Sequence, residues 1–252
     1  MIVFYGLTDR SGAFTLANIL SIATAEHRKA LWLSLGLSLV STIICFILAY
    51  PLALILRSRG IGQGSFIVFI FILPMWMNFL LRTYAWMSLL EDNGLINNML
   101  AAVGLPRLHM INTAGAVVLG MVYNYIPYMI LPIYSVLTKI DSSVIEAAQD
   151  LGANDRKVFL KVVFPMSMPG VISGITMVFV PAVSTFIISK MLGGGGNLLI
   201  GDLIDMQFLG SAYNPNLGSA ISLVLMVIIL ICMGIMNQFD DGDASVGGGM
   251  IL

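Results

Sequence analysis

Residues 141–165 read DSSVIEAAQDLGANDRKVFLKVVFP and form the longest clearly polar, helix-forming run in a chain that is otherwise mostly apolar. Ser143 and Glu146 have the spacing of a capping box, in which two residues satisfy free backbone N–H groups at the start of a helix. Gly152 can take the left-handed backbone conformation that closes a helix. The run therefore predicts a helix that starts near Ser143 and ends at Gly152.

A second short helix is expected directly after Gly152. Asn154 and Asp155 supply acceptors for its first N–H groups, and Pro165 is expected to end it. Because apolar segments flank the run on both sides, it must leave the bilayer between two membrane spans. The sequence thus predicts a helix–glycine–helix knuckle on the face of a membrane protein.

The composition defines the class of protein. Of the 252 residues, 58% are hydrophobic and only 10% are charged, with a mean hydropathy of +0.96. Soluble domains carry about 25% charged residues, so this is a polytopic membrane protein. Its apolar runs are long and do not alternate, which selects an all-α membrane helix bundle over a closed barrel. A formal net charge of −1 leaves no electrostatic basis for binding nucleic acid.

Five spans are visible, in a single transmembrane domain at residues 1–236, followed by an acidic tail at 237–252 that we expect to be disordered. The expected spans are residues 31–56, 66–90, 113–137, 168–188 and 217–236. Lysines and arginines gather in the loop after the first span and in the loop at 139–165, which contains the knuckle. Positive loops favour the cytoplasmic side of the membrane. We therefore expect the 139–165 loop to be cytoplasmic.

The knuckle resembles the EAA loop of ABC-transporter inner-membrane permeases, whose pattern is E-A-A-x3-G-x9-I-x-L-P. The matching residues are Glu146, Ala147, Ala148, Gly152, Val162, Phe164 and Pro165. Val162 and Phe164 replace Ile and Leu and keep the apolar character. The resemblance implies a type I ABC importer permease-like bundle whose 139–165 loop docks on a separate ATPase subunit. Members usually have six spans, so this chain would lack the first. A plain helical hairpin between two spans is the alternative.

Three further stretches resemble the spermidine/putrescine permease branch of this family. They are LPMWMNFLLRTYAW at 73–86, PYMILPIY at 127–134 and LGGGGNLLIGDLIDMQFL at 192–209. The resemblance implies an importer that moves polyamines by alternating access. Permeases for iron, thiamine, sulfate and molybdate have the same permease architecture and remain alternatives.

A polyamine pathway needs aromatic faces and carboxylates, because ammonium groups bind over aromatic rings and pair with acids. The candidate pathway residues are Trp76, Asn78, Tyr84, Trp86, Tyr123, Asn124, Tyr128, Asp202 and Asp205. Aromatic belts at the membrane surface and solvated loop acids are the plain alternatives. Arg82 would repel a cation, so we expect it to have a structural role, with Asn78 or Glu91 as a partner.

The chain is not expected to be an enzyme, because it has no G-x-x-x-x-G-K-[ST] run to cradle phosphates. His27 and His109 are isolated and predict no metal site. The resemblance implies that ATP and Mg bind to a partner ATPase dimer and that this chain binds no cofactor. It also implies a second, homologous permease subunit, an extracytoplasmic binding protein and a bacterial inner-membrane location.

Two other classes of function stay open at this stage. A secondary transporter or channel would need paired broken-helix repeats and ionisable residues within the membrane. A membrane scaffold that transports nothing would keep the knuckle but show no substrate-dependent change.

Overall fold

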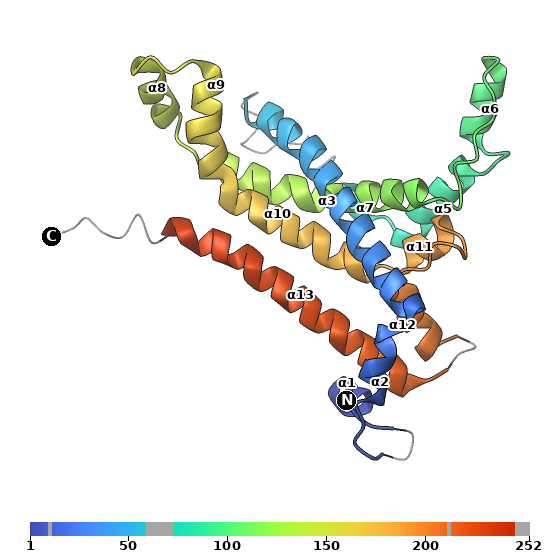
Figure 1. Ribbon diagram of the computed structural model, residues 1–252. Helices are drawn as coiled ribbons and strands as arrows, with labels where there is room; N and C mark the ends of the chain where they lie inside the picture. Colours follow the sequence, from blue (N-terminus) through green and yellow to red (C-terminus); the bar gives the residue numbers. More distant parts are fainter. Residues whose placement is uncertain (10–11, 59–72, 211–212, 245–252) are drawn as a thin grey trace. The chain divides into compact units, whose positions relative to one another are not determined.

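The computed structural model describes residues 1–9, 12–58, 73–210 and 213–244, and these residues are almost entirely helical (Figure 1). Within these ranges there is no β-strand, and the only extended pairing is an isolated bridge between Thr8 and Phe14. Four of the described helical segments are long and apolar enough to cross a membrane. They are Ala25–Ser58, Ala114–Leu137, Asp155–Ser184 and Pro215–Met236. The chain is therefore an all-α, multi-pass membrane protein.

The described helices follow one another in chain order. They are α1 (Ile2–Gly6), α2 (Ala17–Leu20), α3 (Ala25–Ser58), α5 (Phe79–Leu90), α6 (Leu95–Ala102), α7 (Ala114–Leu137), α8 (Ser142–Asp150), α9 (Asp155–Val158), α10 (Phe164–Ser184), α11 (Ile187–Leu192), α12 (Ile200–Phe208) and α13 (Pro215–Ala244). A 3₁₀ turn (Ser21–Ala23) precedes α3, and a π-helical segment (Phe159–Val163) joins α9 to α10. Glu26 in the first turn of α3 and Arg57 in its last turn have the charges that favour each end of the helix dipole.

The second expected span, residues 66–90, differs from an unbroken helix in its described part. Residues 66–72 lie outside the described residues, and so do Arg59 and the glycines that follow the first span. Residues 73–76 are helical, but the helix stops at Met77 and α5 starts anew at Phe79. The Asn78 side chain accepts a hydrogen bond from the Leu80 N–H (2.8 Å). Asparagine is among the preferred helix caps, so its amide starts a new helix within the apolar stretch.

The chain does not leave the helix at Pro165, contrary to our expectation. Helix α9, the π segment and α10 form one continuous helical run from Asp155 to Ser184. A proline inside a helix removes one N–H, and its ring clashes with the carbonyl four residues earlier, here that of Lys161. Lys161 lies in the wider π turn, which is where such a distortion is accommodated.

Two other helix ends differ from the expected limits. Helix α10 stops at Ser184, where the Ser184 hydroxyl donates to the carbonyl of Val180 (3.2 Å), and α11 then begins at Ile187. Helix α13 continues to Ala244, so residues 237–244 are helical and not part of a disordered tail. Residues 237–241 contain neither proline nor glycine, so no residue stops the helix there. Residues 245–252 lie outside the described ranges.

The chain divides into two compact units. Unit 1 contains Met1–Ser41, Met77–Asn124 and Phe179–Ile231. Its core is built from Ile22, Val183, Ile200, Ala220, Ile221 and Leu225. The backbone N–H of Ile200 donates to the hydroxyl of Ser34 (2.8 Å), which ties α12 to α3 in this unit.

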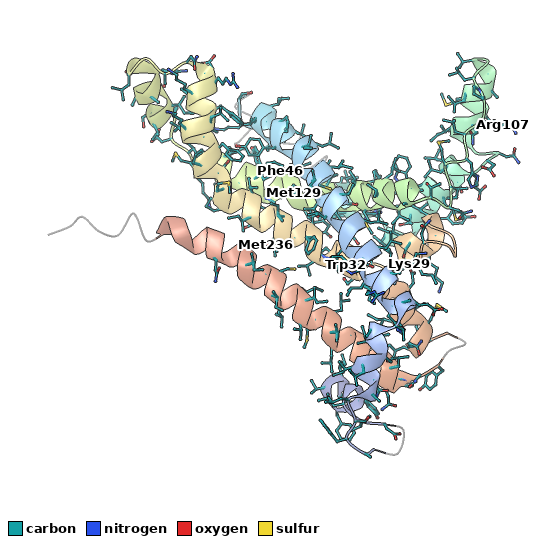
Figure 2. The ribbon with its side chains drawn as sticks, in the orientation of Figure 1. Lys29, Trp32, Phe46, Arg107, Met129 and Met236 are labelled. Atoms are coloured by element: carbon teal, nitrogen blue, oxygen red, sulfur yellow. The ribbon has the colours of Figure 1, made fainter. Side chains whose placement is uncertain are left out.

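Unit 2 contains Thr42–Trp76, Tyr125–Val178 and Cys232–Leu252. Here α7 and α10 pack closely, because Gly170 and Gly174 lie on the side of α10 that faces Met129, Pro132 and Val136 of α7. Met129 is fully buried and is labelled in Figure 2. This unit also carries α8 and α9, the two helices of the knuckle.

Candidate coupling site and substrate pathway

Helix α8, the first helix of the knuckle, begins at Ser142 because Asp141 caps it. The Asp141 carboxylate accepts a hydrogen bond from the Ser143 N–H (3.0 Å). Hydrogen bonds from the backbone and hydroxyl of Ser143 lower the pKa of Asp141 from its ordinary value. The expected capping box between Ser143 and Glu146 is not used, since the aspartate two residues earlier already supplies the acceptor.

The end of α8 has the predicted geometry. Gly152 has φ +82°, the left-handed conformation expected from the sequence. Its N–H donates to the carbonyl of Gln149 (2.8 Å), and the N–H of Ala153 donates to the carbonyl of Ala148 (3.1 Å). This pair of bonds is the Schellman motif, which satisfies the last carbonyls of the helix and turns the chain sharply.

Helix α9 follows at once and runs back beside α8 (Figure 1). The Asn154 side chain caps α9 by accepting from the Lys157 N–H (3.0 Å), as the sequence predicts. A hydrogen bond from the Gln149 amide to the Asp155 carboxylate (3.4 Å) links the two helices. The knuckle is therefore fixed internally by caps and a side-chain bond.

The outer surface of the knuckle is exposed in the described part of the chain. Helix α8 has no buried residue, and both Glu146 and Ala147 are exposed. Leu151 stands next to Gly152 with 90% of its surface exposed. Burial of this side chain by another surface would remove its apolar area from water. Leu151 is not part of the E-A-A-x3-G-x9-I-x-L-P pattern. Its position as a large apolar residue at the turn of a polar knuckle is the signal that could have identified it.

The remaining residues of the motif lie on the helical run that leads back from the knuckle. Val162 is half-buried in the π segment, while Phe164 is half-buried and Pro165 is exposed at the start of α10. Phe164 stacks against Phe159 with ring centroids 6.2 Å apart. These residues thus connect the exposed knuckle to the apolar part of unit 2.

The aromatic pathway candidates divide between the two units. In unit 1, Trp86 and Tyr123 contact each other edge to face, with centroids 5.3 Å apart, and Tyr84 is exposed. In unit 2, Trp76 is exposed and Tyr128 contacts the ring of Tyr125, with centroids 6.4 Å apart. Of the candidates, the structure therefore brings Trp86 and Tyr123 together.

The polar candidates are mostly engaged in bonds within unit 1. Asn78 caps α5, and Asn124, which is 1% exposed, donates to the Gly120 carbonyl (2.9 Å). The Oδ1 atom of Asn124 is buried and has no hydrogen-bond partner among the described residues. It is therefore a buried polar acceptor to which the described part of the chain supplies no donor.

The acidic candidates of α12 also have local partners. Asp202 is 4% exposed and accepts from the Leu199 N–H (2.8 Å), which caps α12. Burial raises the pKa of the Asp202 carboxyl, against the opposing effect of hydrogen bonds from Ser189 and Leu199. Asp205 forms a salt bridge with Lys190 (3.1 Å). Neither carboxylate is a free, solvated acid.

Arg82 is the buried cation of α5. Its side chain is 7% exposed, and its Nε and Nη1 atoms have no hydrogen-bond partner within the described ranges. No described bond joins its guanidinium to Asn78 or Glu91, the two partners expected from the sequence. Glu91 instead accepts from Asn97 through its carbonyl (3.2 Å), within the hairpin that carries α6 and Arg107 (Figure 2).

Comparison with known proteins gives the family. A profile of the family described as binding-protein-dependent transport system inner membrane component matches residues 17–241. The chain is 37% identical over 217 residues to the spermidine/putrescine transport system permease protein PotB of Haemophilus influenzae, which covers 85% of this chain and 76% of that protein. It is 35% identical over 218 residues to PotB of Escherichia coli, covering 86% and 79%.

Solved structures show the same fold at lower identity. A bacterial ABC transporter involved in the import of the acidic polysaccharide alginate matches with a TM-score of 0.74 and 17% identity, over 94% of this chain and 87% of that chain. The MetNI methionine ABC transporter matches with a TM-score of 0.59 and 20% identity, over 83% and 92%. From the profile match, the relatives and the spanning helices together, the chain belongs to the family of binding-protein-dependent transport system inner membrane components, as a multi-pass permease subunit of an ABC importer.

Proposed function

We propose that this permease imports polyamines, with spermidine and putrescine as substrates. The proposal is supported by 37% and 35% identity to two spermidine/putrescine permeases across more than four fifths of the chain. The observation that supports a coupling role is the knuckle of α8 and α9, whose outer surface is exposed and whose internal geometry is fixed. The paired rings of Trp86 and Tyr123 offer a face of the kind that ammonium groups bind.

We infer the partners from the family and from the exposed knuckle. The chain assembles with an ATPase dimer, a second homologous permease and an extracytoplasmic binding protein. ATP and Mg bind to the ATPase, and this chain supplies no nucleotide site. The knuckle lies on the cytoplasmic side, which agrees with its lysines and arginines at positions 139, 156, 157 and 161.

The mechanism follows from this arrangement. Closure of the ATPase dimer on ATP displaces the knuckle, and the spans move between inward-facing and outward-facing states. The binding protein delivers the polyamine to the outward-facing state, and hydrolysis resets the transporter. Glu146 pairs with a basic group on the ATPase, while Ala147 and Ala148 leave room for its close approach.

The test is ATP-dependent uptake of spermidine and putrescine into proteoliposomes that contain this chain, its ATPase, the second permease and the binding protein. We expect uptake by the unmodified chain and at least tenfold less with Glu146→Arg, because the reversed charge would repel the basic partner. Glu26→Arg, which reverses an exposed charge in the first turn of α3, is the matched control and is expected to transport normally.

Each result bears on a separate part of the proposal. If no polyamine moves while the ATPase still co-purifies, the substrate is wrong, and iron, thiamine, sulfate or molybdate should be tested in its place. If the ATPase does not bind the unmodified chain, the coupling role of the knuckle is wrong.

A further inference from the structure

The C-terminal half of α3 contacts the protein on both sides of the knuckle. Ile140 directly precedes the Asp141 cap of α8, and Ser167 lies in the first turn of α10, just after Pro165. Arg57 bonds to Ile140, and Tyr50 bonds to Ser167. Both contacts lie within unit 2. One helix therefore holds the two ends of the 141–165 segment.

The first contact is a charge-assisted hydrogen bond. Nη2 of Arg57 donates to the carbonyl oxygen of Ile140 over 3.0 Å. Ile140 is buried, so this carbonyl needs a donor from within the protein. Bonds from an ionised donor are shorter and about twice as strong as neutral ones. Arg57 thus fixes the position at which the chain enters the knuckle.

The second contact joins two buried hydroxyl groups. The Tyr50 and Ser167 oxygens are 2.7 Å apart, and the two residues are 5% and 0% exposed. The Ser167 hydroxyl donates its one proton to the carbonyl of Phe164 (2.8 Å), so the Tyr50 hydroxyl must be the donor between them. This bond fixes the position at which the chain leaves the knuckle.

Aromatic packing surrounds the second contact. The ring of Tyr50 lies 5.6 Å from that of Phe46, 5.9 Å from that of Phe159 and 5.6 Å from that of Phe164. Phe46 on α3 is labelled in Figure 2. Such ring pairs add about 0.5–1.5 kcal/mol each beyond the area that they bury. The tyrosine is therefore held firmly against the π segment.

The two contacts lie on one continuous helix, which has Pro51 between them. Tyr50 and Arg57 are seven residues apart, which places them on the same side of α3, two turns or about 10.5 Å from each other along the axis. Cys45, Ala49 and Ala53 are fully buried at intervals of four residues, so small side chains let α3 pack closely in this unit.

We propose that Tyr50 and Arg57 are positioning residues that clamp both ends of the knuckle segment to α3, here called the α3 clamp. The inference rests on the coupling role proposed above. A displacement of the knuckle by the ATPase moves Ile140 and Ser167, and the two bonds transmit that movement to α3. The α3 clamp therefore determines how much of the knuckle's movement in each ATPase cycle is transmitted to the membrane spans. It contributes nothing to the binding of the ATPase.

The test compares Tyr50→Phe, Ser167→Ala, Arg57→Ala and Arg57→Lys in the fully reconstituted transporter. The measured quantities are the number of substrate molecules taken up per ATP hydrolysed, the stimulation of hydrolysis by the binding protein, and the affinity for the ATPase. Tyr50→Phe combined with Arg57→Ala is expected to lower uptake per ATP on the order of tenfold. Arg57→Lys, which keeps a charged donor, is expected to restore part of the loss.

Two controls separate the clamp from general damage. Lys29→Ala removes an exposed cation near the start of α3, whose side chain has no hydrogen bond among the described residues, and it is expected to leave uptake per ATP unchanged. Tyr50→Phe and Ser167→Ala remove the same bond from its two sides, and Ser167→Ala also removes the bond to Phe164, so the double variant is expected to be no worse than Ser167→Ala alone. If Arg57→Ala does not fold, the proposal is tested by Arg57→Lys and by comparing Tyr50→Phe and Ser167→Ala with their double variant.

The outcomes are distinct. Unchanged uptake per ATP in the variants would overturn the clamp, and so would a loss of ATPase binding, because the bonds would then serve docking. If the unmodified transporter moves no polyamine, the proposed substrate fails. The clamp is then judged by whether the variants lose the stimulation of hydrolysis by the binding protein.

Discussion

A Cβ atom added to Gly170 would lie 2.8 Å from the carbonyl oxygen of Pro132, so α10 and α7 meet backbone to backbone. Gly174, one turn further along α10, would bring a Cβ within 2.8 Å of the Met129 sulfur. The two glycines have the G-x-x-x-G spacing that allows close helix packing in membranes.

Replacing Gly170 should therefore destabilise unit 2. We expect Gly170→Val to lower the free energy of unfolding by about 1–3 kcal/mol, because backbone atoms cannot move aside as a flexible side chain can. Thermal unfolding in detergent measures the change. Gly234→Ala, at a helical glycine with open space around it, is the control and is expected to be neutral or slightly stabilising. An equal effect of both variants would contradict this close approach.

Leu151 offers a test of the docking surface that does not depend on charge. Leu151→Asp should leave the melting temperature of the isolated chain unchanged, because the side chain makes few contacts there. It should weaken ATPase binding on the order of tenfold or more, since an apolar anchor would be lost from the interface. Co-purification and titration with the ATPase measure this. Leu209→Asp, at a site that is 85% exposed outside the knuckle, is the control and should bind normally.

The buried carboxyl of Asp202 predicts a pH dependence of stability. Burial raises the pKa of Asp202 above its ordinary value of 3.8. The stability gained by protonation is therefore fully present below that value and is lost as the pH rises through the folded pKa. Asp202→Asn keeps an acceptor for Leu199 but does not titrate. We expect the melting temperature of the unmodified chain, relative to that of the variant, to fall as the pH rises from 3.8 through the folded pKa. Parallel curves would contradict the prediction.

Arg82 should be dispensable for the stability of the isolated chain. Its buried Nε and Nη1 atoms lack partners in the described part of the chain, and unpaired buried polar groups cost free energy. Arg82→Met, of similar length, should raise the free energy of unfolding by about 1–3 kcal/mol. Arg28→Met removes an exposed cation and should change it little. A lower melting temperature for Arg82→Met than for Arg28→Met would show that Arg82 stabilises the chain.

Local chemistry explains which parts of the knuckle could be predicted. The left-handed Gly152 and the Asn154 cap depend on neighbouring residues alone, and both predictions are confirmed. The start of α8 was predicted two residues late. Asp141 and Ser143 are both good caps that differ in free energy by only tenths of a kcal/mol, so the spacing of a capping box does not choose between them.

Longer-range features could not be predicted from the sequence. The turn that carries the chain past Pro165 adopts π geometry, where local rules expect the helix to end. The hydrogen bond from Arg57 joins residues 83 positions apart, and no local pattern specifies it. The class of fold, by contrast, follows from the length and hydropathy of the spans.

The π segment between the knuckle and α10 also sets how far α8 and α9 are rotated about the helix axis relative to α10. Each residue of an α-helix turns the chain by about 100° around the helix axis. A π turn contains more residues than an α turn, so each of its residues turns the chain by less. If residues 159–163 adopted α geometry instead, each of the five would turn the chain by roughly 20° more, and α8 and α9 would rotate by about a quarter turn relative to α10. The face that carries Glu146 would then point in another direction, although every side chain of the knuckle would be intact. The direction in which the knuckle faces thus depends on the π geometry of a single turn.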